Sequence, residues 1–179
     1  PRPGTPEAGT RHVIDSTLSL ARARGGRPPD GARPDGRFLL ATGPPVPAPE
    51  PGSVLLLPAT GGVGKAWGGH AHAALAQRLA ASGRPVVVAW GPGEEDLARN
   101  IVSAGGGDVT MAPPTTILQL ASLISQCAAV VGGDTGTVHL AASLGIPTVA
   151  VFLRTDPERN GPRGSAVRVL TAAAGGARR

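Results

Sequence analysis

The stretch VVGGDTGTVH at residues 130–139 gathers several chemically capable groups in a short space. Asp134 offers a carboxylate, Thr135 a hydroxyl and Gly136 a backbone amide with no side chain, and His139 follows one helical turn later. Backbone N–H groups at the start of a helix bind anions, and a carboxylate can accept sugar hydroxyls. The Asp-Thr-Gly triplet is also typical of aspartic proteases, so two kinds of chemistry are open at this point.

A glycine-rich loop earlier in the chain has the composition of an anion-binding loop. Its sequence is PATGGVGKAWGG (residues 58–69), with Thr60 near its start and Lys65 after three glycines. Glycines let backbone N–H groups approach an anion, and lysine adds a point charge. Lys65 is the single lysine beside sixteen arginines, which favours a role in binding over a solvated surface turn. The loop is not a Walker A loop, because Ala66 stands where that motif has Ser or Thr. Trp67 could pack in the core or cover the loop.

A third loop, WGPGEEDLA at residues 90–98, places Glu94 and Glu95 directly after an apolar run. Carboxylates in that position can accept both hydroxyls of a ribose, as in dinucleotide-binding folds. They also suit the first turn of a helix, where a negative charge is stabilised by about 0.3–1 kcal/mol. The sequence leaves these two interpretations open.

His70 and His72 form the one His-x-His pair in the chain. Two residues apart on a helix, their side chains diverge, and no carboxylate accompanies them. We therefore expect no metal site, and no other cofactor.

The segments that would carry these loops alternate between two patterns from residue 53 onward. Short runs that are apolar throughout are typical of buried parallel strands, and the segments between them are typical of helices. The expected strands are residues 54–57, 86–90, 108–111, 129–132, 147–152 and 167–170. Helices are expected over 69–82, from 94, from 115 or 116 to about 127, and over 137–145. The pattern predicts an α/β fold, a Rossmann-like doubly wound parallel sheet.

The three loops each follow a strand, so in such a sheet they meet at one edge, where ligands bind. This arrangement excludes an aspartic protease, which has a β-rich fold and needs two aspartates close together. Here Asp134 follows a single buried strand and leads into a helix, with no second Asp-Thr-Gly triplet. A nicotinamide dehydrogenase domain would need a Gly-x-Gly-x-x-Gly motif after the first strand, which the sequence lacks.

The amino-acid composition of the chain limits the binding partners and the cellular compartment that we expect. The net charge is +5, but the arginines are scattered and aromatic residues make up only 2%, so we expect no nucleic-acid partner. Cys127 is the sole cysteine, which suits a reducing cytoplasm. We find no signal-peptide pattern and no uncharged apolar run approaching the ~18 residues that a membrane helix needs.

Proline and glycine content divides the chain into three parts. Residues 1–52 read as a linker region with one short helix near HVIDSTLSLARARGG, which we expect to dock on another part of the molecule. Residues 53–170 form the predicted nucleotide-binding domain, and residues 171–179 a flexible tail.

Four motifs in this domain together resemble a known family. They are LLLPATGGVGKAWGGHAHAALAQRLAASG, VVVAWGPGEEDLA, QLASLISQCAAVVGGDTGTVHLAASLGIPTVAVF and TDPERNGPRG. In order and spacing they are similar to the C-terminal half of glycosyltransferase family 9, the lipopolysaccharide heptosyltransferases and their relatives. The resemblance covers roughly residues 53–170, and HVIDSTLSLARARG looks like the segment that joins the two halves in that family.

The resemblance implies a two-domain GT-B fold, of which this chain is one half, and metal-independent inverting transfer. It implies that the C-terminal domain binds a sugar nucleotide, typically ADP-heptose, and that an N-terminal domain binds a glycolipid acceptor and carries the general base. The family works in the cytoplasm, peripheral to the inner membrane. By resemblance, Thr60 and Lys65 hold the diphosphate, Glu94 or Glu95 the ribose, the backbone near Thr115 the adenine and Asp134 the sugar, while Thr135, Gly136 and His139 lie at the phosphates.

Two departures from the family pattern shape the expected activity. Gly61 stands where many members have a second Thr or Ser, which removes a hydroxyl donor. The first ~50 residues are too few for an acceptor domain, so this domain is missing from the sequence given. We therefore expect a chain that holds no catalytic base, stabilises the leaving group through Lys65, and is inactive by itself. The alternative is a degenerate, non-catalytic Rossmann-like domain that acts as a binding module.

Overall fold

The computed structural model describes residues 12–27, 34–41, 44–59 and 67–171. Parallel strands and helices alternate along the chain as the sequence predicts. The strands are β1 (Val54–Leu57), β2 (Val86–Val88), β3 (Val109–Met111), β4 (Ala129–Gly133), β5 (Thr148–Phe152) and β6 (Val167–Thr171). The helices are α1 (Val13–Ala23), α2 (Gly69–Ala81), α3 (Glu95–Gly105), α4 (Ile117–Ser125), α5 (Gly136–Ser143) and α6 (Pro157–Asn160), with a 3₁₀ helix, η1 (Arg37–Ala41).

The six strands form one parallel sheet in the order β3-β2-β1-β4-β5-β6. The chain starts in the middle at β1, winds outward through β2 and β3, and then returns to the other side of β1 to build β4, β5 and β6. This is the doubly wound strand order of dinucleotide-binding folds. The predicted fold class is therefore confirmed.

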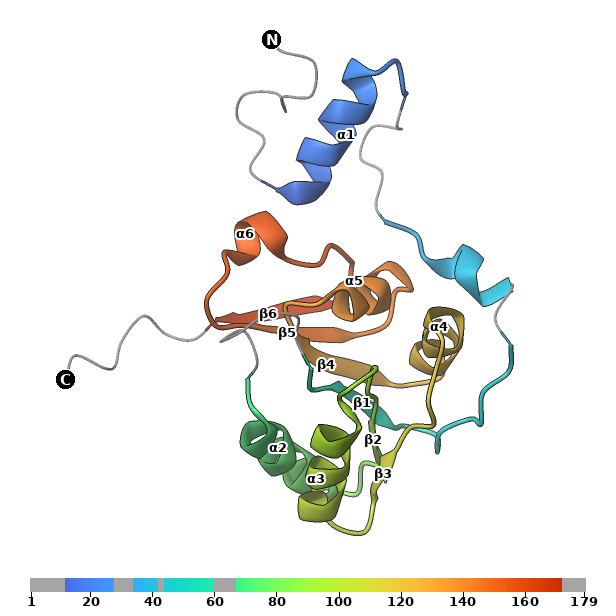
Figure 1. Cartoon of the computed structure of the whole chain (residues 1–179), viewed down its shortest axis with the longest axis vertical. Helices are drawn as coiled ribbons and strands as arrows, with labels where there is room; N and C mark the ends of the chain where they lie inside the picture. The colour runs from blue at the N-terminus through green and yellow to red at the C-terminus, as the bar shows by residue number, and fades with distance from the viewer. Residues whose placement is uncertain (1–11, 28–33, 42–43, 60–66, 172–179) are drawn as a thin grey trace, which may run out of the picture.

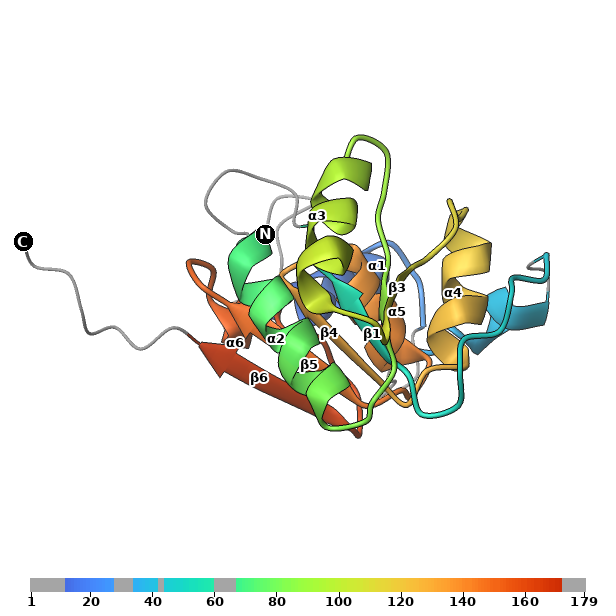
Figure 2. The same cartoon turned by 90° about the horizontal axis from the view of Figure 1, so that it is seen from below.

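Helices cover both faces of the sheet. Figure 1 shows α2 and α3 together on one face and α4 and α5 on the other, and the view from below in Figure 2 has α2 and α3 in front of the strands. Alternate residues of β1 divide between these layers: Leu55 and Leu57 pack with α4 and α5, while Val54 and Leu56 pack with α2 and α3. Because every second side chain of a strand points to the same face, a fully apolar strand is what such a three-layer core requires.

A close approach between β1, β4 and α5 depends on Gly132. A Cβ atom on this residue would lie 2.8 Å from Cγ2 of Val138 and 3.0 Å from Cβ of Leu57. Because Gly132 has no side chain, the start of α5 can pack directly against the ends of the two central strands. The loop that follows β4 is thereby held close to the middle of the sheet.

The helix α1 lies outside the layers, next to α6 (Figure 1). His12 is its N-cap: Nδ1 accepts a hydrogen bond from the amide of Ile14 at 3.1 Å, so Nε2 carries the hydrogen and donates to the carbonyl of Gly161 at 2.9 Å. Arg163 donates to both carboxylate oxygens of Asp15, at 2.8 and 2.5 Å. The expected docking of this helix therefore takes place on the segment around α6. Two short elements, η1 and α6, were not expected from the sequence.

Candidate functional site

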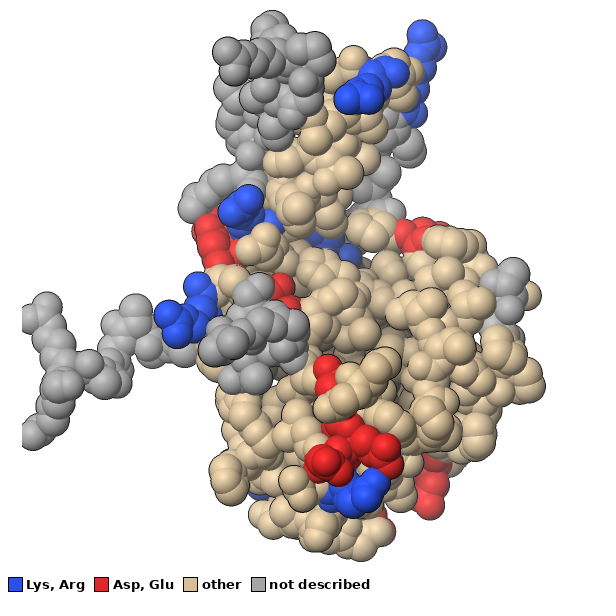
Figure 3. Space-filling model, in the orientation of Figure 1, with Lys and Arg blue, Asp and Glu red and all other residues tan. Residues whose placement is uncertain are grey.

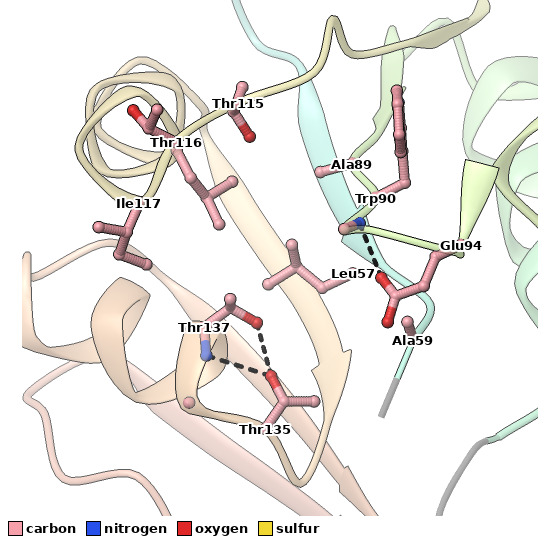
Figure 4. A pocket seen from close by; sticks show the side chains of 13 residues that line it. Leu57, Ala59, Ala89, Trp90, Glu94, Thr115, Thr116, Ile117, Thr135 and Thr137 are labelled. Carbon is pink, nitrogen blue, oxygen red and sulfur yellow. Dashed lines mark hydrogen bonds between the residues drawn. The ribbon is translucent and has the colours of Figure 1, made fainter. Parts of the chain in front are cut away.

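A cavity of about 500 Å³ lies at the carboxyl edge of the sheet, within the size range of small-molecule sites. One wall comes from the ends of β1 and β2 and the turn after β2, and the opposite wall from the starts of α4 and α5 (Figure 4). Its lining residues are Leu57, Ala59, Ala89, Trp90, Gly91, Glu94, Thr115, Thr116, Ile117, Leu120, Thr135, Gly136 and Thr137.

The position of the cavity follows from the strand order. The chain winds away from β1 in one direction through β2 and in the other through β4, so the loops after these strands turn to opposite faces of the sheet. The gap between such loops is where doubly wound folds bind ligands. The prediction that separate loops meet at one edge holds for the loops at residues 90–98 and 132–139.

The predicted site residues fall into three groups. Glu94, Thr115, Thr135 and Gly136 line the cavity. Asp134 and His139 are half-buried, next to the lining segment of α5 rather than in it, and Glu95 lies outside, on the exposed side of α3. Thr60 and Lys65, together with Gly61, lie outside the described residues.

The start of α5 presents polar backbone to the cavity. Thr135 is the N-cap, and its Oγ1 accepts a hydrogen bond of 3.1 Å from the amide of Thr137. The two threonine hydroxyls also bond to each other at 2.5 Å (Figure 4). Gly136, the first residue of the helix, is exposed, and apart from its chain neighbours and the backbone of α5 no atom lies within 4 Å of the place a Cβ would take. An anion can thus reach the backbone at the positive end of the helix dipole.

Asp134 and His139 share one environment beside this helix start. The hydroxyl of Thr155 donates to Oδ2 of Asp134 at 2.7 Å. Burial lowers the pKa of His139, and this effect outweighs the opposing influence of the Asp134 carboxylate and of a backbone hydrogen bond with Asn160. The lowered pKa favours the neutral form of the His139 imidazole.

The two glutamates after β2 have different surroundings. Glu94 faces the cavity, and its Oε2 accepts a hydrogen bond of 2.7 Å from the amide of Gly91, which closes the turn (Figure 4). Glu95 forms an ion pair with Arg99 one turn along α3, at 2.5 Å. Figure 3 shows acidic and basic side chains gathered on the surface in the region of α3. Of the two, Glu94 is the one that lines the cavity.

Apolar and hydroxyl groups come from both walls of the cavity. The indole N–H of Trp90 donates to the carbonyl of Ala112 at 2.8 Å, which fixes the ring at the end of β2. Opposite, Thr116 caps α4 in a capping box with Gln119, and Ile117 stands 57% exposed at the mouth. A flat apolar group, such as a nucleobase, fits between walls of this kind.

The two histidines of α2 lie in different surroundings. His70 is exposed, whereas His72 is buried, with Nδ1 bonded to the carbonyl of Gly68 at 2.9 Å and its ring edge-to-face with Trp67 at 4.9 Å. The predicted divergence of the pair is confirmed. In the part of the chain that the structure describes, no group of three or more His, Cys, Asp or Glu side chains could hold a metal ion.

Some functional candidates were missed in the sequence. The cavity is also lined by Trp90, Thr116 and Ile117, which no motif of their own marks. The direction in which a loop turns decides which of its residues face the cavity. Thr155 could have been found: it follows β5, next to β4 in the sheet, so its loop ends at the same edge as Asp134.

Comparison with known proteins gives the family. The model of glycosyltransferase family 9 (heptosyltransferase) matches residues 6–177. Lipopolysaccharide heptosyltransferase 1 of Pseudomonas aeruginosa is 31% identical over 117 residues, which are 64% of this chain and 33% of that protein. Lipopolysaccharide heptosyltransferase 2 of Escherichia coli is 29% identical over 114 residues, 61% of this chain and 33% of that protein.

Solved structures show the same fold. E. coli heptosyltransferase WaaC with ADP superposes with a TM-score of 0.73 at 27% identity, over 89% of this chain and 50% of that one. A family 9 glycosyl transferase from Veillonella parvula gives a TM-score of 0.73 at 18% identity, over 93% of this chain and 50% of that one, which supports the fold alone.

The chain thus spans about a third of the length of its curated relatives and half the length of the solved ones, as one half of a GT-B fold does. Among the helices of the described residues, none has the length and apolarity to cross a bilayer. The match over nearly the whole sequence, together with the strand order and the cavity, decides the family: the chain belongs to glycosyltransferase family 9.

Proposed function

We propose that this chain is the donor-binding half of an inverting glycosyltransferase and that it binds an ADP-sugar of the ADP-heptose type. The transferase would act in the synthesis of lipopolysaccharide or another cell-surface glycan, in the cytoplasm at the inner membrane, where its glycolipid acceptor is found. The names of the relatives support this pathway. The structure's own contribution is the cavity at the carboxyl edge of the sheet.

The observation that carries the proposal is that one cavity brings together apolar side chains, a carboxylate and the start of a helix. Trp90 and Ile117 suit a nucleobase, the Glu94 carboxylate suits a ribose, and the start of α5 suits a diphosphate. A nucleoside diphosphate has a part to match each of these groups. The likeness to a heptosyltransferase solved with ADP supports adenine as the base.

The proposed mechanism needs no metal. A base on the acceptor half deprotonates the acceptor hydroxyl, which attacks the anomeric carbon from the face opposite the diphosphate. The departing diphosphate gains negative charge as the bond to the sugar breaks. The positive end of α5 at Gly136 and Thr137 stabilises that charge, and by family resemblance Thr60 and Lys65 add a hydroxyl and a cation.

Neutral His139 has a defined place in this scheme. With its pKa lowered by burial, it stays neutral beside the phosphates and brings no full charge there. Asp134, next to it, would accept hydroxyls of the transferred sugar. The general base is assigned to the acceptor half, and transfer would need that half to be present.

Calorimetric titration of the 179-residue chain with ADP and with UDP tests the proposal. We expect ADP to bind more tightly than UDP, and Lys65→Ala to weaken ADP binding at least about tenfold, or ~1.4 kcal/mol. Arg78→Ala, an exposed cation in the last turn of α2, is the matched control and should leave binding unchanged. If a folded chain binds neither nucleotide, the degenerate binding module becomes the better reading.

A further inference from the structure

Two loops that are distant in sequence meet beside the cavity, where a side-chain hydrogen bond joins them. Thr155 Oγ1 donates to Asp134 Oδ2 at 2.7 Å across a separation of 21 residues. Asp134 follows β4 and Thr155 follows β5, and these strands pair in parallel as far as Gly133 and Val151. The contact therefore joins neighbouring strand ends at the ligand-binding edge of the sheet.

The loop that carries Thr155 is fixed from several sides. Directly after it, Asp156 caps α6 by accepting a hydrogen bond of 2.9 Å from the amide of Glu158. At the end of α6, the carbonyl of Gly161 accepts the hydrogen bond from His12 of α1. A threonine held on such a loop can fix the direction of a carboxylate, because its own backbone has little freedom to follow the carboxylate.

We infer that Thr155 is a positioning residue for the sugar part of the donor: its hydroxyl holds the Asp134 carboxylate in the orientation that accepts hydroxyls of the transferred sugar. This inference rests on the proposed function. A carboxylate has lone pairs for about four hydrogen bonds, and the bond from Thr155 occupies one of them and restrains the orientation of the group. Thr155 itself need not touch the donor.

The position of the pair points to the sugar rather than to the nucleoside. Thr135 and Gly136 line the cavity, whereas Asp134 and Thr155 do not. A diphosphate bound at the start of α5 would lie between the two regions, with the nucleoside in the cavity and the sugar on the side of Asp134. Loss of the Thr155 hydroxyl should therefore change recognition of an ADP-sugar and leave recognition of ADP alone.

The test compares two ligands, ADP and ADP-heptose, on the full chain. Thr155→Val keeps the shape of the side chain and removes the donor, and Thr155→Ser keeps the donor. We expect Thr155→Val to bind ADP within about twofold of the unmodified chain and ADP-heptose about tenfold more weakly, the size of effect that loss of a hydrogen bond to a charged group produces. Thr155→Ser should bind ADP-heptose about as tightly as the unmodified chain.

A remote threonine provides the matched control. Thr110 on β3 is exposed and donates to the carbonyl of Val86 at 3.3 Å, away from the cavity. Thr110→Val should leave both affinities unchanged. Thermal unfolding of each variant would show that the loop change has not unfolded the domain.

The outcomes separate this inference from the proposed function. If the unmodified chain does not bind ADP, the proposed function fails, and the inference fails with it. If ADP binds normally but Thr155→Val weakens both ligands equally, or neither, then Thr155 has only a structural role and the inference is wrong. The same conclusion follows if the unmodified chain binds ADP-heptose no more tightly than ADP.

Discussion

The amide of Gly91 donates a hydrogen bond of 2.7 Å to the carboxylate of Glu94, at the edge of the cavity. This bond closes the turn after β2 and holds the carboxylate at the site. The same carboxylate thus shapes the loop and faces the position proposed for the ribose. Glu95, the next residue, pairs with Arg99 instead and takes no part in the cavity.

Replacing Glu94 should reduce recognition of the ribose. Glu94→Gln keeps an oxygen that can accept the Gly91 amide, so the turn should survive, but it removes the charge that strengthens hydrogen bonds to ribose hydroxyls. We expect ADP binding to weaken about tenfold and the preference for ADP over 2′-deoxy-ADP to shrink by about the same factor. Calorimetric titration with both nucleotides measures this.

Glu95→Gln is the matched control. Its ion pair with Arg99 is exposed, so it contributes little to stability, and Glu95 does not line the cavity. ADP affinity should stay within about twofold of the unmodified chain. Equal losses for Glu94→Gln and Glu95→Gln would assign the effect to the general acidity of the α3 start.

Two glycines of the central loop should respond differently to alanine. In Gly136→Ala the new methyl group meets no atom within 4 Å apart from its chain neighbours and the backbone of α5, so the free energy of unfolding should be unchanged or rise by up to ~1 kcal/mol. The same methyl group would block an anion from the backbone at the start of α5. We expect ADP affinity to fall at least about tenfold in a fully folded protein.

Gly132→Ala should instead lower the free energy of unfolding. Its methyl group would press on Val138 and on both the side chain and the backbone of Leu57. Overpacking of this kind costs about 1–3 kcal/mol, which urea unfolding would detect.

If Gly136→Ala kept full ADP affinity, the start of α5 would not be the place where the phosphates bind.

Some parts of the fold can be predicted from the local sequence pattern, and others cannot. The central strands β1 and β2 were predictable because they are fully apolar, a consequence of burial on both faces. The edge strands β3 and β6 include Thr110 and Arg168, so their apolar pattern is weaker. The common edge of the loops follows from parallel strands alone. The ends of the strands were harder to predict. Ala89 and Trp90 continue the apolar run beyond β2, yet they form part of the wall of the cavity.

Pairings across the fold could not be deduced from local pattern. Nothing near Glu94 and Glu95 in sequence decides which of them faces the cavity, because that depends on the turn at Gly91. The bonds of His12 to Gly161 and of Asp15 to Arg163 join segments about 150 residues apart, and they form only once the sheet has placed α6 beside α1. Such contacts depend on tertiary structure.

The contact between α1 and the α6 segment should depend on His12. Its ring both caps α1 and reaches the carbonyl of Gly161, and it is buried. His12→Ala removes both bonds, at a cost to helix docking of about 1–2 kcal/mol. Hydrogen exchange of the α1 amides should therefore become about five- to thirtyfold faster, while exchange in the sheet stays unchanged.

Two further variants separate capping from docking. His12→Asn keeps a capping side chain but is too short to bond Gly161, so it should give an intermediate rate. Thr17→Ala removes an exposed hydroxyl bonded within α1, to Val13, and should change little. If His12→Ala left exchange in α1 unaffected, the helix would be held by other contacts, with Asp15 and Arg163 the first to examine.

Acid should destabilise the domain through two histidines. Burial lowers the pKa of both His72 and His139 in the folded chain, whereas an unfolded histidine titrates near 6.5. Below about pH 6.5 the unfolded state therefore binds more protons, and stability that is fully present above this pH is lost as the pH falls, by up to ~1.4 kcal/mol per pH unit for each histidine. The ion pair with Arg163 lowers the pKa of Asp15, so that carboxylate affects stability only at lower pH, below about 4.

Removing one titrating ring should flatten this acid dependence. In His72→Asn the side-chain amide can still donate to the carbonyl of Gly68, as Nδ1 does, but it does not titrate. Urea unfolding between pH 7.5 and 5 should then show a smaller loss of stability than the unmodified chain. His70→Asn, an exposed neighbour on the same helix, should leave the loss as it was. An unchanged slope in His72→Asn would mean that His72 takes up its proton without unfolding, through a rearrangement of the α2 start that brings the ring to water.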